Sequence, residues 1–147
     1  MKILVLHGIN LDMFGKRDPQ HYGTVTLPEI DAQLRKLAAE LDVGIETFHS
    51  NHEGVMCERI HRAHEQDFAA VLINAGAWTH YNYGLRDALA ILRVPIIEVH
   101  MSNVDAREPF RQQTVLGDII RGKITGFGFE SYLLALRAAV SVGRAPR

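Results

Sequence analysis

The sequence predicts a single α/β domain, residues 1–147, built on a parallel β-sheet. Short apolar segments alternate along the chain with segments of helical periodicity, which is the pattern of strand–helix units. All but the second of the apolar segments are near-continuous, as expected for strands covered on both faces. No repeat, low-complexity tract or linker divides the chain, and its length suits one domain.

Local signals give the expected elements. Thr26-Leu27-Pro28-Glu29 is a capping box with proline in the first turn, so a helix begins there, and its apolar stripe continues to Leu41. Further helices are expected at 54–65, at 83–92 and from Glu130 onward, and strands at 2–7, 43–48, 69–74, 94–99 and 123–127. This order indicates the flavodoxin-like doubly wound class, a five-stranded sheet of order 2-1-3-4-5 that binds ligands at the carboxyl ends of its strands.

Composition and charge exclude several classes of protein. Lys and Arg total 16 and Asp and Glu 17, so the net charge of −1 gives no broad basic field for nucleic acid or anionic membranes. The apolar run at the N-terminus is too short for a signal peptide or a membrane span. The single cysteine, Cys57, excludes an internal disulfide. We therefore expect a cytoplasmic protein with no nucleic-acid or membrane partner.

Polar residues gather where the predicted strands end. Asn10 follows the first strand, 50–53 the second and 74–80 the third, while 98–103 complete the fourth. Because the carboxyl ends of parallel strands face one side of the sheet, these groups should converge on one crevice. One such cluster means little, since Asn and Ser routinely cap helices. Four clusters at the same edge favour a functional site.

Glu98 and His100 are candidates for acid–base chemistry. They are two residues apart, so on a continuing strand their side chains point to one face. A carboxylate beside an imidazole fixes its tautomer and favours its charged form, which suits a general acid or base. The alternative is an ordinary surface ion pair. Because the pair ends a buried strand, the functional interpretation is preferred.

The segment 9–24, between the first strand and the first helix, is long for such a connection. Gly15, Pro19 and Gly23 interrupt it, and Met13 and Phe14 are its large apolar anchors. We expect this segment to be a mobile lid at the ligand-binding edge. Arg17 and Tyr22 both belong to it, and a nearby cation favours the ionised form of a tyrosine.

Three further residues suit binding of a polar ligand, each with a simpler alternative. Asn74 and His80 could hold ligand hydroxyls, although Asn74 could equally cap a helix and His80 fill a satisfied core site. Arg111 could clamp a carboxylate or lie on a solvated helix face. No metal or nucleotide is expected, because His61 and His64 lack further ligands and 126–131 lacks the third glycine of a dinucleotide fingerprint.

Five segments together resemble the type II dehydroquinase family. They match its motifs in order and without a large insertion, a combination more specific than any single motif. The segments are 7–23 (family pattern NGPNLNLLGxREPxxYG), 50–54 (SNHEG), 74–80 (NPxAxTH), 85–89 (LRDAL) and 98–108 (EVHLSNxxARE). Ile9, Asp12 and Asn82 depart from the family, but no departure removes a residue with a chemical role.

The resemblance implies a lyase that dehydrates 3-dehydroquinate to 3-dehydroshikimate through an enolate, without a cofactor. The reaction belongs to the shikimate pathway of aromatic amino acid biosynthesis, or to quinate breakdown. Tyr22 is implied as the base at C2, with Arg17 holding it as tyrosinate. Asn10 is implied to position a water that stabilises the enolate. His100, held by Glu98, is implied to protonate the departing C1 hydroxyl.

The resemblance also implies how substrate is bound and how subunits assemble. Substrate hydroxyls and carboxylate would contact Asn74, His80, Ser102, Arg111 and the backbone at Met101. Asp87 would reach the site of a neighbouring subunit in a homododecamer built from trimers. Two alternatives stay open: a flavodoxin-like small-molecule binding module, and a repurposed or inactive member of the family.

Overall fold

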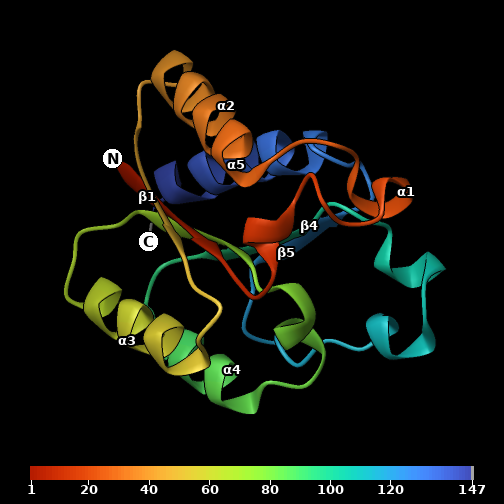
Figure 1. Cartoon of the computed structure of the whole chain (residues 1–147). Coiled ribbons are helices and arrows are strands. Elements are labelled where there is room, and N and C mark those ends of the chain that lie inside the picture. The colour runs from red at the N-terminus through yellow and green to blue at the C-terminus, as the bar shows by residue number, and fades with distance from the viewer. Residues whose placement is uncertain (147) are drawn as a thin grey trace.

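A computed structural model describes residues 1–146 and contains one sheet of five parallel strands in the order β2-β1-β3-β4-β5 (Figure 1). The predicted fold class and strand order are therefore confirmed. The strands are β1 (Lys2–His7), β2 (Gly44–His49), β3 (Ala70–Asn74), β4 (Ile96–His100) and β5 (Gly122–Thr125).

Helices cover both faces of the sheet. In Figure 1, α2 (Leu27–Glu40) and α5 (Glu130–Arg144) lie on one face, and α3 (Glu53–His64) and α4 (Tyr83–Ala90) lie on the other. Alternate side chains of β1 face opposite sides of the sheet. Ile3 and Val5 pack in the core under α2 and α5, whereas Leu4 and Leu6 pack under α3 and α4. Within residues 1–146, none of the helices has the length and apolar character needed to cross a membrane.

The capping box predicted at Thr26 is present. The Thr26 side chain accepts a hydrogen bond from the Glu29 backbone, and the Glu29 side chain accepts one from the Thr26 backbone. The boundaries of the other long elements lie within about two residues of those predicted. The strand β5 ends earlier, at Thr125, because Gly126 turns the chain with a φ of 100°.

The segment between β1 and α2 contains two short helices that the sequence did not predict. They are the 3-10 helix η1 (Leu11–Met13) and the single-turn helix α1 (Pro19–Tyr22), which has Asp18 as its N-cap and proline in its first turn. The expectation that Met13 anchors this segment is wrong, since Met13 is 44% exposed. Leu11 and Phe14 anchor the segment instead, at 1% and 3% exposure.

The ends of β1 and β3 meet closely, and this contact positions the loops that follow. The Gly8 backbone N–H donates to the Asn74 carbonyl at 2.7 Å. A Cβ atom on Gly8 would lie 2.5 Å from the Ala75 carbonyl oxygen, so only glycine fits here. In this topology β1 and β3 connect to helices on opposite faces, so a crevice opens between their loops.

We predict that Gly8→Ala lowers the free energy of unfolding by about 1–3 kcal/mol, because the new methyl group must push the ends of β1 and β3 apart. The control is Gly54→Ala in α3, where nothing lies within 4 Å of the added Cβ. That variant should be neutral or more stable by up to about 1 kcal/mol. Urea unfolding followed by circular dichroism measures both, and equal stability of the two variants would contradict the prediction.

Candidate active site

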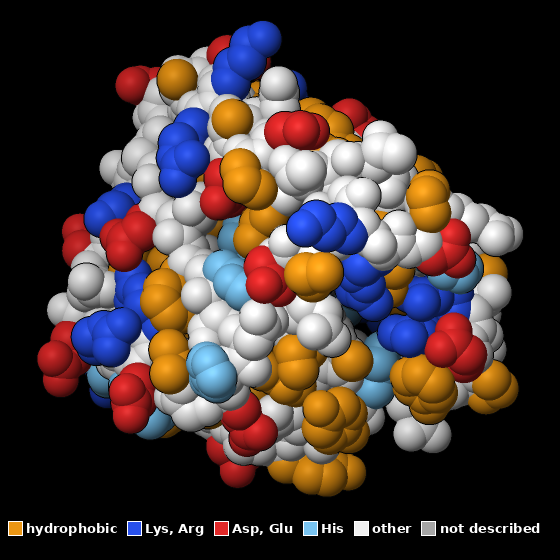
Figure 2. Space-filling model, in the orientation of Figure 1, with side chains coloured by type: hydrophobic (Ala, Val, Ile, Leu, Met, Phe, Trp, Pro, Cys, Tyr) orange, Lys and Arg blue, Asp and Glu red, His pale blue; other side chains and the backbone are white. Residues whose placement is uncertain are grey.

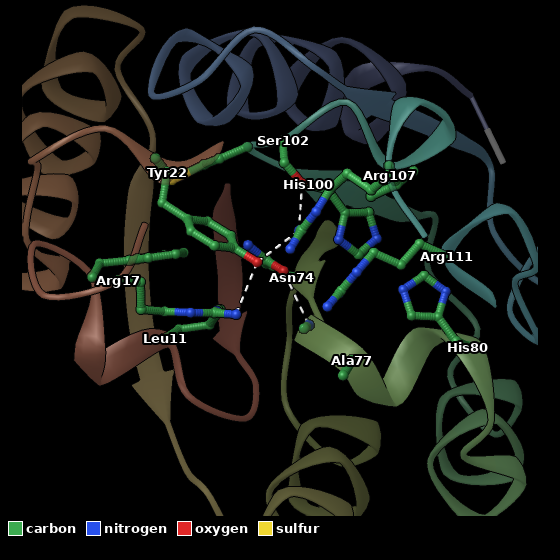
Figure 3. A pocket seen from close by; sticks show the side chains of 14 residues that line it. Leu11, Arg17, Tyr22, Asn74, Ala77, His80, His100, Ser102, Arg107 and Arg111 are labelled. Carbon is green, nitrogen blue, oxygen red and sulfur yellow. Dashed lines mark hydrogen bonds between the residues drawn. The ribbon is translucent and has the colours of Figure 1, made fainter. Parts of the chain in front are cut away.

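A crevice at the carboxyl ends of the strands collects most of the predicted site residues (Figure 3). About 360 Å³ in and around it is not occupied by protein atoms, and part of this space is open to solvent. On the surface, Figure 2 shows a hollow bordered by Lys or Arg side chains and histidine. The lining includes Arg17, Tyr22, Asn74, His80, His100, Met101, Ser102, Arg107 and Arg111.

The Tyr22 hydroxyl receives hydrogen bonds from two guanidinium groups. Arg17 Nη2 lies 2.8 Å and Arg107 Nη1 2.7 Å from the Tyr22 oxygen. The guanidinium carbons also lie 4.0 Å and 5.1 Å from the centre of the Tyr22 ring. Tyr22 is only 8% exposed and its ring packs against Phe14. Two charged donors in a partly desolvated site can stabilise a negative charge on this oxygen.

Arg107 is the functional residue that reasoning from the sequence missed. It appeared there only as part of the segment 98–108, without a role. The structure places its side chain, which is 8% exposed, between Tyr22 and Ser102, and Arg107 Nη1 donates to Ser102 Oγ at 3.1 Å. Its position in the family motif was the one sign in the sequence that Arg107 could have a role. Its contact with Tyr22 could not be predicted, because the two residues are 85 apart in the sequence.

Glu98 and His100 form a buried pair, not a surface ion pair. His100 Nε2 lies 2.7 Å from Glu98 Oε1, and the two side chains are 7% and 0% exposed. Thr79 Oγ1 donates to the same carboxylate oxygen at 2.6 Å. Burial alone raises the pKa of the Glu98 carboxyl, but the hydrogen bonds from His100 and Thr79 outweigh it and hold that pKa below its usual range. An ionised Glu98 fixes the His100 ring and leaves its Nδ1 free of that pair.

His80 and Arg111 lie on the far side of the crevice from Tyr22 (Figure 3). The two rings of His80 and His100 stack with centroids 6.4 Å apart. His80 Nδ1 lies 2.6 Å from the Gln113 carbonyl, so this nitrogen donates and Nε2 is left for a ligand. Burial lowers the pKa of His80 against the opposing effect of that backbone bond, which favours the neutral ring. Arg111 is held by Glu108 at 3.2 Å and is not on a solvated helix face.

Asn74, Met101 and Ser102 come from the ends of β3 and β4, as expected. Asn74 is 3% exposed, and its Oδ1 accepts a hydrogen bond from the Gly76 backbone at 3.1 Å. Met101 and Ser102 directly follow β4, and Ser102 Oγ is held by Arg107. Both Asn74 and His80 line this crevice. Asn74 also bonds the first residue of the 3-10 helix Gly76–His80, so its alternative as a helix cap holds beside its place in the crevice.

Three predicted site residues do not line the crevice: Glu98 contacts it only through His100, and Asn10 and Asp87 lie outside it. Asn10 is exposed, and its backbone N–H donates to Asn51 Oδ1 at 2.8 Å in a left-handed conformation with a φ of 67°. Asp87 is exposed on α4 and is not among the lining residues. Within residues 1–146, no group of three or more His, Cys, Asp and Glu residues is arranged to hold a metal ion.

The chain is similar to known proteins along nearly its whole length. Its residues 1–140 match the family described as dehydroquinase class II. It is 64% identical over 147 residues to the 3-dehydroquinate dehydratase of Leptothrix cholodnii, covering 100% of this chain and 99% of that one. It is 63% identical over 138 residues to the 3-dehydroquinate dehydratase of Syntrophotalea carbinolica, covering 94% and 93%.

A solved structure agrees. The crystal structure of a type II dehydroquinase from Butyrivibrio crossotus superposes with a TM-score of 0.93 at 36% identity, over 95% of this chain and 97% of that one. The doubly wound sheet and the buried acid–base groups in its crevice define the class, a small α/β enzyme. More narrowly, the chain belongs to the class II dehydroquinase family, as its motifs predicted.

We predict that Glu98 makes stability depend on pH in the acid range. Its pKa is lower in the folded protein than in the unfolded chain. Ionised Glu98 therefore contributes stability that is present above the unfolded value of about 4.3 and is lost as pH falls through the folded value. Urea unfolding across this range, at one protein concentration, should show a smaller loss of stability in Glu98→Gln than in the wild-type protein.

The control is Glu40→Gln, which changes an exposed glutamate near the end of α2. It should keep the pH dependence of the wild-type protein. If Glu98→Gln and Glu40→Gln lose stability in parallel as the pH falls, the contribution assigned to Glu98 is wrong.

Proposed function

We propose that this chain dehydrates 3-dehydroquinate to 3-dehydroshikimate through an enolate. The observation that carries the proposal is the Tyr22 oxygen held by Arg17 and Arg107 in the same crevice as the buried Glu98–His100 pair. Relatives that are 63% and 64% identical bear the name 3-dehydroquinate dehydratase, which supports the same reaction.

Tyr22 acts as the base. As a phenolate, stabilised by its two guanidinium donors, it takes a proton from C2 of the substrate. The neighbouring C3 ketone accepts the electron pair, so the intermediate is an enolate. Asn10 positions a water that stabilises the enolate oxygen. Because the Asn10 side chain is outside the lining, that water has to bridge from the loop to the crevice.

His100 acts as the acid. Its protonated ring gives a proton to the hydroxyl leaving C1, and the electron pair of the enolate forms the C1–C2 double bond as water departs. Glu98 supports this step because a buried carboxylate stabilises the imidazolium and fixes its orientation. Before the next turnover Tyr22 releases its proton to water, and His100 takes up a proton from water.

The remaining lining groups bind the substrate. Three guanidinium groups, of Arg17, Arg107 and Arg111, line the crevice. Two of them are engaged with Tyr22, and Arg111 is paired with Glu108 through Nε, so the Nη groups of Arg111 are the guanidinium donors left for the substrate. The substrate hydroxyls and carboxylate are held by Asn74, His80, Ser102, Arg111 and the backbone at Met101.

The direct test is an ultraviolet assay with 3-dehydroquinate. The product is a conjugated enone, so purified protein should raise the absorbance without added metal or nucleotide, and a chelator should not change the rate. No absorbance change at high protein concentration would overturn the proposal. The cytoplasmic location expected from the sequence stays a prediction.

The roles within the site give a quantitative prediction. Tyr22→Phe removes the oxygen that carries the charge, and kcat should fall by about 10²- to 10⁴-fold with a much smaller change in KM. His100→Ala should behave alike. Arg107→Ala should also lower mainly kcat, because Tyr22 loses one charged donor. Tyr83→Phe, which alters an exposed tyrosine, is the matched control and should keep normal kinetics. Near-normal turnover of Tyr22→Phe would mean that another group is the base.

We further propose that the active form is a closed homo-oligomer, a dodecamer built from trimers, with Asp87 completing a neighbour's site. Asp87 is exposed on α4, and Tyr81, which precedes this helix, is 58% exposed. An exposed carboxylate and an exposed aromatic side chain at the same helix suit a contact between copies of the chain.

Mixing of two inactive variants tests the shared site. Asp87→Ala and Tyr22→Phe should each be weakly active as oligomers. Dissociated and reassembled together in equal amounts, they should regain about a quarter of wild-type activity, because some sites then take both intact residues from different subunits. Reassembly of each variant alone is the control and should restore nothing. Light scattering that gives a fully active 16.5 kDa monomer would refute the assembly.

A further inference from the structure

A hydrogen-bonded series of buried polar side chains lies behind Asn74, on the side away from the crevice. Asn74 Nδ2 is 2.9 Å from the Tyr132 hydroxyl, which is 3.3 Å from His7 Nδ1. His7 Nε2 is in turn 2.7 Å from Asp31 Oδ1. His7 and Tyr132 are 0% exposed, and only the Asp31 end, with a side chain 18% exposed, approaches solvent. The four residues come from β3, α5, β1 and α2.

With the His7 ring neutral, the two ends of this series of side chains set the direction of every hydrogen bond in it. The Gly76 backbone N–H can only donate, so it requires Asn74 Oδ1 and turns the Asn74 NH₂ group toward Tyr132. The Tyr132 oxygen therefore accepts from Asn74, and its proton is donated to His7 Nδ1. His7 must then carry its proton on Nε2, where the Asp31 carboxylate accepts it.

We propose that Asp31, His7 and Tyr132 are positioning residues that hold Asn74 as a hydrogen-bond donor toward the substrate. The Asn74 carbonyl is occupied by Gly76 and one of its N–H bonds by Tyr132, so the second N–H is the group left for the crevice. Asn74 therefore selects a ligand oxygen with a free lone pair, such as a carboxylate. This inference rests on the proposed function and extends it to the polarity of one contact.

The groups around these four residues support the same direction of the hydrogen bonds between them. Burial raises the pKa of Tyr132, so the hydroxyl keeps the proton that it donates to His7. The second Asp31 oxygen accepts from Thr47 Oγ1 at 3.3 Å, and Thr47 is in turn held by Arg35 at 3.1 Å. An amide flip at Asn74 would set its NH₂ against the Gly76 N–H and lose that hydrogen bond. The flipped carbonyl could accept from Tyr132 only if the Tyr132 hydroxyl gave up its hydrogen bond to His7.

The first experiment reads the His7 tautomer and needs no activity. Histidine-ring ¹H–¹⁵N spectra of the full chain at neutral pH should show His7 with its proton on Nε2 and none on Nδ1. His7→Gln assigns the signals by their disappearance. Asp31→Asn keeps an acceptor oxygen and should keep this tautomer, whereas Asp31→Ala removes the acceptor and should lose it. A proton on Nδ1 in the wild-type protein overturns the proposal.

The second experiment is a double-mutant cycle in kcat/KM for 3-dehydroquinate. Asp31→Ala and Tyr132→Phe should each lower kcat/KM about tenfold, mainly through KM, because Asn74 loses its fixed orientation. Asp31→Asn should stay within about twofold of wild type. The control Lys36→Ala, on an exposed residue of the same helix, should do so too.

In an Asn74→Ala background, adding Asp31→Ala or Tyr132→Phe should change kcat/KM by less than about twofold, because the residue through which they act is gone. Effects that multiply fully in that background indicate general structural damage and overturn the proposal. The two arms separate this inference from the proposed function. A wild-type protein with the expected tautomer but no enone product contradicts the reaction, whereas normal turnover with the opposite tautomer contradicts the positioning chain.

Discussion

The close contact between the ends of β1 and β3 is the constraint on which the site depends. Gly8 lies against the Ala75 backbone, and the hydrogen bond from Gly8 to the Asn74 carbonyl joins the two strands at their last residues. From this point the chain diverges, carrying Tyr22 away on one loop and His80 on the other. Because helices cover both faces of the sheet, a ligand at this edge is enclosed by the loops that follow the strands.

Charge in the crevice is arranged by burial as much as by proximity. Glu98 has no exposure and does not line the crevice, and its partner His100 does. Arg17 comes from the segment after β1 and Arg107 from the segment after β4, so positive charge is concentrated around Tyr22 while negative charge stays behind His100. The proposed acid, His100, and the proposed base, Tyr22, thereby have opposite electrostatic surroundings in one crevice.

The sequence was sufficient for contacts that follow from strand order, and insufficient for those that depend on helix packing. Parallel strands bring their ends together, so Asn74 and His100 could be placed at one edge from periodicity alone. Arg107 meets Tyr22 only because two loops fold toward each other, and no local pattern reports that approach. The same holds for His7 and Tyr132, which are 125 residues apart and meet through the packing of α5 on the sheet.

Tyr22 belongs both to the crevice and to the hydrophobic core, where it packs with Phe14. A side chain of this size contributes roughly 1.5–3 kcal/mol when it is buried. Withdrawing the loop far enough to release Tyr22 would therefore forfeit part of the core, which makes full opening a local unfolding event and not a free hinge motion. Mutations that loosen the core under α2 should therefore displace Tyr22, the proposed base, before they unfold the protein.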